Sequence, residues 1–202
     1  MCQSFFRDSR FYWLLTELDR QIAESVRSAG CGFCGGVLHR GDFPRKPRGA
    51  FAFDETSDTR RCSLCCAEEG CRRRTTPPSV RFLGRKVYLG VVVILITALQ
   101  HGLSPRRRRE LADRLDLSPK TFYRWRNWWR EVFAASATWR GLSRRLLPPP
   151  EVEALPGALL GRLPGEDLEG RVMALLIHLL PLTTGSPCAD SLRGWVSPQK
   201  MG

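Results

Sequence analysis

The sequence predicts a mainly α-helical protein with a small β-structured insertion. Apolar residues recur at helical spacing on both sides of residues 31–80. That segment holds six of the eight cysteines together with many Gly and Pro residues. A capping and turn pattern then interrupts a basic helical stretch near Ser118. We therefore expect an amphipathic helix over residues 1–30, a four-cysteine zinc ribbon over 31–80, a helix-turn-helix domain over 81–147, and over 148–202 a Pro linker, C-terminal helices and a frayed tail.

The charge of the chain is distributed unevenly. The net charge is +12, with 43% hydrophobic and 26% charged residues, which is too apolar for wholesale disorder. Between Arg72 and Arg130 there are 15 Lys and Arg residues and three acidic residues, whereas the rest of the chain has 17 of each. This concentration predicts a polyanionic partner. Arg makes up 28 of the 32 basic residues, which suits bidentate contact with phosphate or guanine but is also what GC-rich coding produces.

The sequence shows no sign of secretion or of membrane insertion. Its first residues lack a basic region followed by an apolar region and a cleavage site. The most apolar run, Val87–Leu99, has about 13 residues, whereas a membrane span needs roughly 20. Cysteines in such a chain are typical of metal ligands rather than disulfides. We expect a cytoplasmic, nucleoid-associated protein with no membrane partner.

The first expected helix covers residues 9–28. Asp8 or Ser9 can cap it, and Gly30 can end it. It either packs on the rest of the fold or mediates dimerisation. Its apolar face consists of Phe11, Leu15, Leu18, Ile22 and Val26.

The apolar spacing, Gly and Pro residues of the rest of the chain predict its other strands, loops and helices. Short strands are expected over residues 36–39 and 61–65, and residues 40–58 form a long loop rich in turn residues. The three prolines at 148–150 mark a linker. Further helices are expected over residues 87–100, 106–115, 119–133, 152–163 and 167–180.

A metal site is predicted in the cysteine-rich segment. Cys31 and Cys34 are separated by two residues and followed by two glycines, so both thiolates lie on one side of a tight turn whose backbone can present N–H groups to the sulfurs. Zinc needs four such ligands in a tetrahedron. The second pair comes from Cys62, Cys65, Cys66 and Cys71. We favour Cys66 and Cys71, because Gly70 directly before Cys71 permits the turn that a second pair requires. Cys65 is the alternate to Cys66, because adjacent strand residues face opposite sides.

The expected ion is a structural Zn2+. Four cysteines leave no open position on the metal, and the sequence has no Glu-flanked His pair typical of catalytic zinc. A segment this poor in apolar residues also needs the folding free energy that a bound metal supplies. His39 is a weaker candidate ligand and is more typical of a surface loop. The alternative is that the cysteines are free, buried or redox-active thiols.

Residues 108–125, RRELADRLDLSPKTFYRW, have the pattern of a helix-turn-helix. Ser118 is a good N-cap and Pro119 a good first helical residue. Phe122 and Trp125 lie three residues apart and can pack the second helix on the first. The other positions that we expect to face inward are Leu111, the small Ala112, Leu115 and Leu117.

The outward residues of this pattern predict contacts with DNA. The N-terminal part of a recognition helix lies nearest the bases, which favours Lys120, Thr121 and Arg124 for the major groove. The arginines at the start of the first helix stand where the helix dipole disfavours cations, a cost that a phosphate would offset. The alternative is that these arginines form a charged surface that is exposed to solvent and binds no partner. The expected contacts are Lys120, Thr121, Tyr123, Arg124, Asn127, Arg107 and Arg108.

Three pieces of the sequence together resemble a known family. They are the Cys31–Cys34 motif, the later SLCCAEEGCRRR segment, and the string ELADRLDLSPKTFYRWRNWWRE. Over residues 31–133 the chain resembles the zinc-ribbon plus helix-turn-helix DNA-binding proteins of bacterial insertion sequences, which implies a transposase-like region that binds terminal repeats. The chain departs from a common transposase, which needs three spaced carboxylates that hold two metals. Only 55 residues follow Leu147, and they read as two helices and a tail.

These observations predict a non-enzymatic protein that binds double-stranded DNA sequence-specifically. Its expected role is that of a transposition-associated protein or regulator of a mobile element, with a separately encoded transposase as a candidate partner and no small-molecule substrate. One alternative is the DNA-binding part of a split or degenerate transposase or nuclease. Another is an RNA-binding zinc protein. Competition between duplex DNA and RNA separates the last alternative, because a helix-turn-helix fits the B-form major groove.

Overall fold

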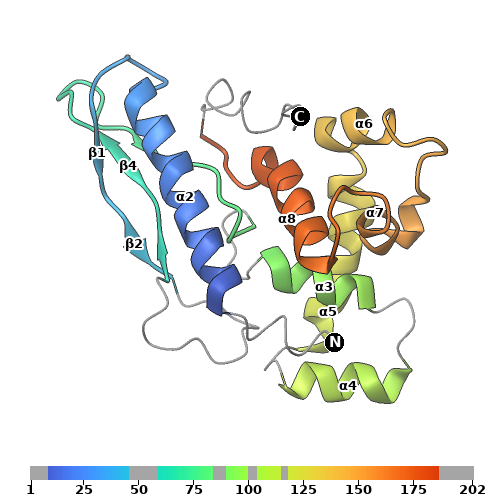
Figure 1. Cartoon of the computed structure of the whole chain (residues 1–202). Coiled ribbons are helices and arrows are strands. Elements are labelled where there is room, and N and C mark those ends of the chain that lie inside the picture. Colours follow the sequence, from blue (N-terminus) through green and yellow to red (C-terminus); the bar gives the residue numbers. More distant parts are fainter. Residues whose placement is uncertain (1–8, 46–58, 84–89, 100–103, 115–117, 187–202) are drawn as a thin grey trace. The chain divides into compact units, whose positions relative to one another are not determined.

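The computed structural model describes residues 9–45, 59–83, 90–99, 104–114 and 118–186, apart from a few helical side chains. The described part of the chain is mainly helical with two small antiparallel sheets (Figure 1), as the sequence predicts. It divides into two compact units. Unit 1 contains the described residues between 90 and 176, and unit 2 contains residues 9–45, 59–83 and 177–186.

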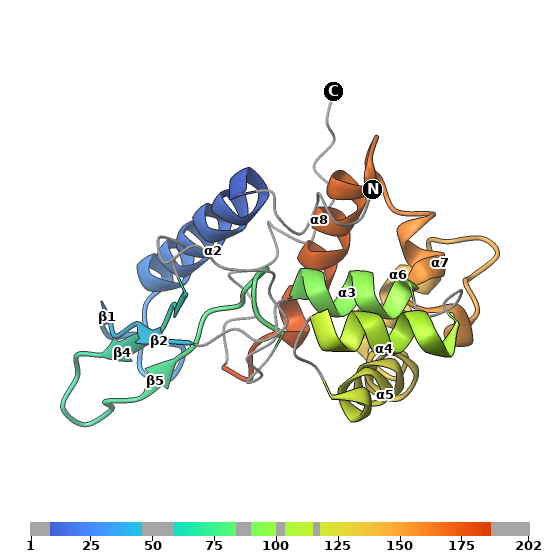
Figure 2. The ribbon, with the colours of Figure 1, turned by 90° about the horizontal axis from the view of Figure 1, so that it is seen from below.

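Unit 2 combines one long helix with the two sheets. Strands β1, β4 and β5 form a three-stranded antiparallel sheet in the order β1-β4-β5, and β2 pairs with β3. Figure 2 shows this sheet beside the helix. The elements are α2 (Ser9–Ala29), β1 (Leu38–Arg40), β2 (Phe43–Pro44), β3 (Arg60–Arg61), β4 (Leu64–Cys66), β5 (Arg74–Thr75) and the 3-10 turn η4 (Leu180–Leu182).

Helix α2 confirms the expected amphipathic helix almost to the residue. Four of its five expected apolar positions are at most 2% exposed, but Leu18 is only half-buried. The fully buried residue at this point is its neighbour Asp19. The helix ends at Gly30 as predicted: Gly30 has φ +80°, and a Cβ there would lie 2.8 Å from the carbonyl oxygen of Gly35. Glycine tolerates this backbone conformation, which side chains disfavour.

Asp19 is buried because residues far along the chain satisfy it. Its carboxylate accepts hydrogen bonds from Ser79 Oγ at 2.6 Å, from Val80 N at 2.8 Å and from Arg81 Nε at 2.8 Å. The Arg81 guanidinium also donates to the carbonyl of Arg60 at 2.8 Å. This buried ion pair ties α2 to residues 79–81 and fixes how the helix sits on the rest of unit 2.

Unit 1 is a set of helices around an aromatic and aliphatic core. Helix α3 is buried on several sides, as expected for a central helix, and it contacts both α5 and α7 (Figure 1). The elements are α3 (Gly90–Leu99), α4 (Pro105–Arg114), α5 (Pro119–Asn127), the π-helical turn η2 (Trp128–Phe133), α6 (Ala137–Ser143), the 3-10 turn η3 (Val152–Ala154), α7 (Gly157–Leu160) and α8 (Leu168–Leu179), whose last three residues belong to unit 2.

The aromatic core of unit 1 follows the end of α5. Trp129 and Phe133 are 0% exposed, and their ring centroids lie 4.9 Å apart. Phe133 in turn lies 5.6 Å from Trp139 on α6. The π-helical turn keeps Trp125, Trp129 and Phe133, which are spaced by four residues, all on the buried side.

Two parts of unit 1 differ from the expectation. Helix α6 was not expected, and its N-cap is Ser136, whose hydroxyl accepts a hydrogen bond from Trp139 N at 3.1 Å. The helix expected over residues 152–163 is instead a 3-10 turn followed by the four-residue α7. Pro156 stands between them, and because proline lacks an N–H and restrains the residue before it, a continuous helix is broken there.

Several expectations concern residues outside the described part of the chain. They include Asp8 as a cap, most of the loop over residues 40–58, and the helix-turn-helix corner at residues 115–117. The C-terminal tail from residue 187 onward and the side chain of Leu111 also lie outside it.

Candidate functional site

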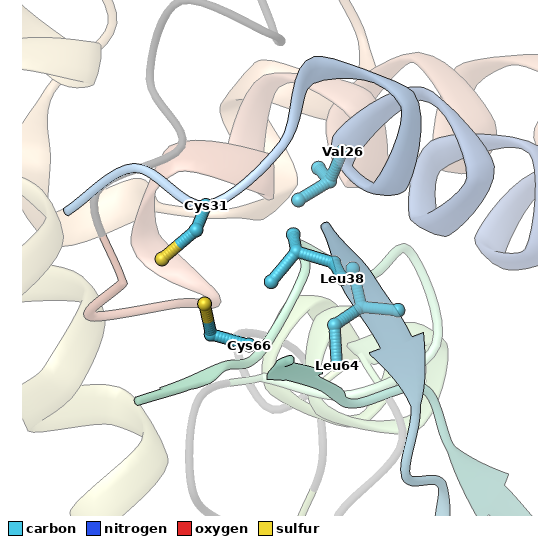
Figure 3. Packing of buried hydrophobic residues seen from close by; sticks show 5 residues of the cluster. All are labelled: Val26, Cys31, Leu38, Leu64 and Cys66. Carbon is cyan, nitrogen blue, oxygen red and sulfur yellow. The ribbon is translucent and has the colours of Figure 1, made fainter. Parts of the chain in front are cut away.

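Four cysteine sulfurs gather at one end of unit 2. The Sγ atoms of Cys31, Cys34, Cys66 and Cys71 all lie within 4.8 Å of one another. They rest on a small apolar cluster that contains Val26, Leu38 and Leu64, and Figure 3 shows the sulfurs of Cys31 and Cys66 facing each other beside it. These are the four cysteines that the sequence analysis favours as metal ligands.

The first pair is held by the turn that follows α2. The N–H of Gly35 donates to the carbonyl of Cys31 at 2.8 Å, and the N–H of Cys31 donates to the carbonyl of Gly36 at 2.9 Å. Gly35 has φ +75°, which only glycine adopts readily. The turn therefore closes on itself and leaves Cys31 and Cys34 on the same side.

The second pair comes from β4 and the turn after it. The N–H groups of Cys71 and Arg72 both donate to the carbonyl of Glu68 at 3.0 Å. We expected Gly70 to permit this turn, but the residue with a left-handed backbone is Arg72, with φ +45°. In both turns the left-handed residue directly follows the second cysteine, and this position, rather than the residue before the cysteine, requires the unusual conformation.

The distances between the sulfurs fit a tetrahedral metal. Cys34 Sγ lies 3.5 Å from Cys66 Sγ, and Cys31 Sγ lies 3.8 Å from Cys71 Sγ. Four sulfurs at a zinc–sulfur distance of about 2.3 Å are separated by about 3.8 Å along each edge of the tetrahedron. A disulfide would require about 2.04 Å, so these sulfurs are at the separation of ligands rather than of bonded atoms.

Backbone N–H groups are aimed at the sulfurs. Those of Phe33 and Cys34 hydrogen-bond to Cys31 and lower the pKa of its thiol to about 7. Burial acts in the opposite direction on Cys66 and raises its pKa to about 12. Donors around a thiolate position a metal ligand and stabilise its charge, so the residues present fit a bound thiophilic metal ion.

The other candidate ligands lie away from this group. Cys65 pairs with His39 across β1 and β4, on the sheet face opposite to Cys66. Its thiol instead approaches the carbonyl of Arg72 at 3.7 Å. Cys62 is buried in unit 2, where burial raises the pKa of its thiol. Neither of these cysteines nor His39 belongs to the four-sulfur group.

A second candidate site is the outward face of α5. Lys120, Tyr123 and Arg124 are exposed, and Asn127 is half-buried. Their spacing of three, one and three residues places them on one side of a helix. Phe122 and Trp125 are at most 7% exposed, which confirms the expected inward face, and Trp129 in the turn after α5 is also buried.

Thr121 does not lie where we expected it. It is only 3% exposed, because it stands four residues before Trp125 and so shares the buried side of α5. Its hydroxyl accepts a hydrogen bond from Arg124 Nη2 at 3.0 Å. The prediction that Thr121 faces outward is therefore wrong, and the residue braces Arg124 instead.

The remaining predicted contacts lie on α4. Arg107 and Arg108 belong to this helix, but their side chains are outside the described part of the structure. Ala112 is 4% exposed, in line with its expected inward position. The next described residue after α4 is Ser118, which is in an extended conformation directly before α5.

Sequence reasoning missed two arginines that lie over aromatic rings near the cysteines. The guanidinium carbon of Arg73 lies 4.4 Å from the ring centroid of Phe33, and that of Arg74 lies 6.0 Å from the ring of Phe43. Arg45 covers the same Phe43 ring at 4.9 Å. The run of three arginines after Cys71 was the available signal.

No described helix is long and apolar enough to cross a membrane. None of the protein-family models, curated proteins or solved structures compared with the chain matches it significantly.

Proposed function

We propose that this protein binds double-stranded DNA through the outward face of α5, with α4 and α5 as a helix-turn-helix. The observation that carries the proposal is the clean division of α5. Basic and polar side chains that can read base edges occupy one side, and the buried aromatic residues Phe122 and Trp125 anchor the other. Arg124 is braced by Thr121, so its guanidinium is held in place before DNA arrives.

We also propose that Cys31, Cys34, Cys66 and Cys71 hold one structural Zn2+. With four thiolate ligands the ion would have no open position for a substrate, and it would supply folding free energy to a unit whose strands are only two or three residues long. Zinc would thus join the end of α2 to β4 without taking part in any reaction.

The metal proposal is tested with two neighbouring cysteines. Cys66→Ser should abolish stoichiometric zinc, measured by atomic emission on purified protein. Cys65→Ser should keep a zinc-to-protein ratio near that of the unchanged chain, because Cys65 lies on the opposite face of the same strand. Equal zinc content in the two variants would refute the assignment of the ligands.

The DNA proposal is tested by selecting bound sequences from a random duplex pool and then measuring affinity for the selected site and for random duplex. Arg124→Ala should cost about 1–3 kcal/mol on the selected site and much less on random DNA, as the loss of a base contact does. Thr121→Val keeps the size of the side chain but removes the hydroxyl that accepts a hydrogen bond from Arg124. It should therefore reduce the preference for the selected site over random duplex. If folded Arg124→Ala loses affinity equally on both DNAs, α5 is only a phosphate-binding surface.

The biological setting that we propose is a mobile genetic element, in which the protein accompanies or regulates a separately encoded transposase. This part of the proposal is supported only by the resemblance of residues 31–133 to insertion-sequence proteins. It is tested by asking whether the selected DNA site matches the terminal repeats of an element that carries the coding sequence.

A further inference from the structure

We propose that Arg73 and Arg74 form a second DNA-contact site, in unit 2, that binds the phosphate backbone independently of α5. The inference rests on the proposed function only in that the ligand is DNA. It differs from that function in its residues, its unit and its mode of contact, which is to backbone phosphates rather than to base edges.

The guanidinium of the first arginine lies over an exposed aromatic ring. Arg73 lies 4.4 Å above Phe33, which stands between Cys31 and Cys34 and is 46% exposed. A guanidinium on an aromatic ring uses its face for the stack, while its N–H groups point outward in the plane. The ring thus pre-orients a fork of donors of the kind that binds a phosphate bidentately.

The second arginine lies on the outer face of the three-stranded sheet. Arg74 pairs with Cys65 in the register of β4 and β5, and Cys65 pairs with His39, so these three residues form a row across the sheet. Buried Leu64 and Cys66 point to the other face. A Cβ on Gly41 would lie 3.6 Å from Arg74 Nη2, so the guanidinium reaches over β1 toward Phe43.

The charges around these arginines favour a polyanion. Residues 31–45 and 59–75 contain seven arginines and three carboxylates. Two of the carboxylates are engaged locally: Asp42 accepts the N–H of Ser63 at 2.9 Å, and Glu69 pairs with Arg72 at 3.9 Å. Neither Arg73 nor Arg74 forms an ion pair with a carboxylate of the described residues. Both are therefore available to phosphates, which occur at regular spacing along DNA.

The test uses the zinc-loaded full chain, a random 20-base-pair duplex and fluorescence anisotropy over a series of salt concentrations. Each of Arg73→Ala and Arg74→Ala should reduce the slope of log affinity against log salt by about one, and the double variant by about two. Arg27→Ala is the matched control, because it removes one exposed positive charge from the same unit and should leave the slope unchanged. Equal slopes for the double variant and this control would overturn the proposal.

A second measurement covers the case in which the double variant does not fold. Phenylglyoxal modifies accessible arginines, and mass spectrometry locates the modified residues in the unchanged protein. Duplex DNA should protect Arg73 and Arg74, and equal modification with and without DNA would overturn the proposal.

The two proposed contact sites are distinguished by the Lys120→Ala/Arg124→Ala variant. If it binds the selected site as the unchanged chain does while Arg73 and Arg74 are still protected, the role of α5 is wrong and the unit 2 site stands. If affinity depends on α5 and protection of the two arginines is absent, the unit 2 site is wrong and the role of α5 stands. A chain that binds no duplex at all refutes both.

Discussion

Replacing Asp19 by alanine should strongly destabilise unit 2. The carboxylate is 0% exposed and accepts three hydrogen bonds, from Ser79, Val80 and Arg81. Arg81 is itself 4% exposed, and its Nε lies 2.8 Å from the Asp19 carboxylate. The substitution therefore removes this counter-charge from a buried guanidinium and leaves a buried hydroxyl and a buried backbone N–H without their acceptor.

The expected loss is about 3–5 kcal/mol of unfolding free energy, the cost of removing one member of a buried ion pair. The orphaned N–H and hydroxyl place the value toward the upper end of this range, since each unsatisfied buried group costs about 1–3 kcal/mol. The Arg81 guanidinium keeps its hydrogen bonds to the carbonyl of Arg60 and to the hydroxyl of Thr16, and these limit the loss of unfolding free energy. A typical domain has a total stability of about 5–15 kcal/mol, so the effect is easily measured.

The unfolding free energies of the variants and of the unchanged chain are compared by urea denaturation monitored with circular dichroism. Glu17→Ala is the control, because Glu17 lies on the same helix and makes an exposed pair with Arg20 at 3.7 Å. Such a pair contributes about 0–1 kcal/mol. The double variant Asp19→Leu/Arg81→Met removes both charges and should recover part of the loss. If Asp19→Ala loses no more stability than Glu17→Ala, the buried ion pair does not hold unit 2 together.

Three further predictions concern folding and activity. Trp125→Ala should destabilise unit 1 by about 3–5 kcal/mol because the ring is 2% exposed, whereas Trp13→Ala should have little effect because that ring is 66% exposed, and thermal denaturation compares them. Gly30→Ala should cost more than about 1 kcal/mol and weaken zinc binding, measured by competition with a chelator, because its φ is +80° and the added Cβ meets the Gly35 carbonyl. The purified chain should leave supercoiled DNA uncut in Mg2+ or Mn2+, and cleavage that co-purifies with it would favour a nuclease.

The long helices could be predicted from the sequence because apolar residues recur at helical spacing along their buried faces. The apolar spacing in α2 and α8 is visible within a short window of sequence. The same method placed Leu18 inside and gave no reason to bury Asp19, since the partners of Asp19 lie 60 to 62 residues away. Short α6 was missed because seven residues with one capping serine give too little periodicity.

The cysteine cluster was accessible to sequence reasoning for a local reason. Ligand pairs in tight turns leave their spacing in the sequence, and strand alternation separates Cys66 from Cys65. The face of α5 was less accessible. Thr121 was assigned by its polar side chain, but its place one turn before Trp125 determines its burial. The ring-stacked arginines could not be assigned, because each pairs with an aromatic residue from another part of the chain.

Strand β4, which carries Cys65 and Cys66, can pair with β1 in the wrong register during folding. If β4 slipped by one residue against β1, Cys65 would replace Cys66 beside the other three thiolates, and a metal ion would accept either sulfur. The same slip would turn Leu64, now 1% exposed, toward water. The buried leucine next to the metal ligands therefore selects the correct register of the sheet, and a chain with a polar residue at position 64 should capture zinc in two competing pairings.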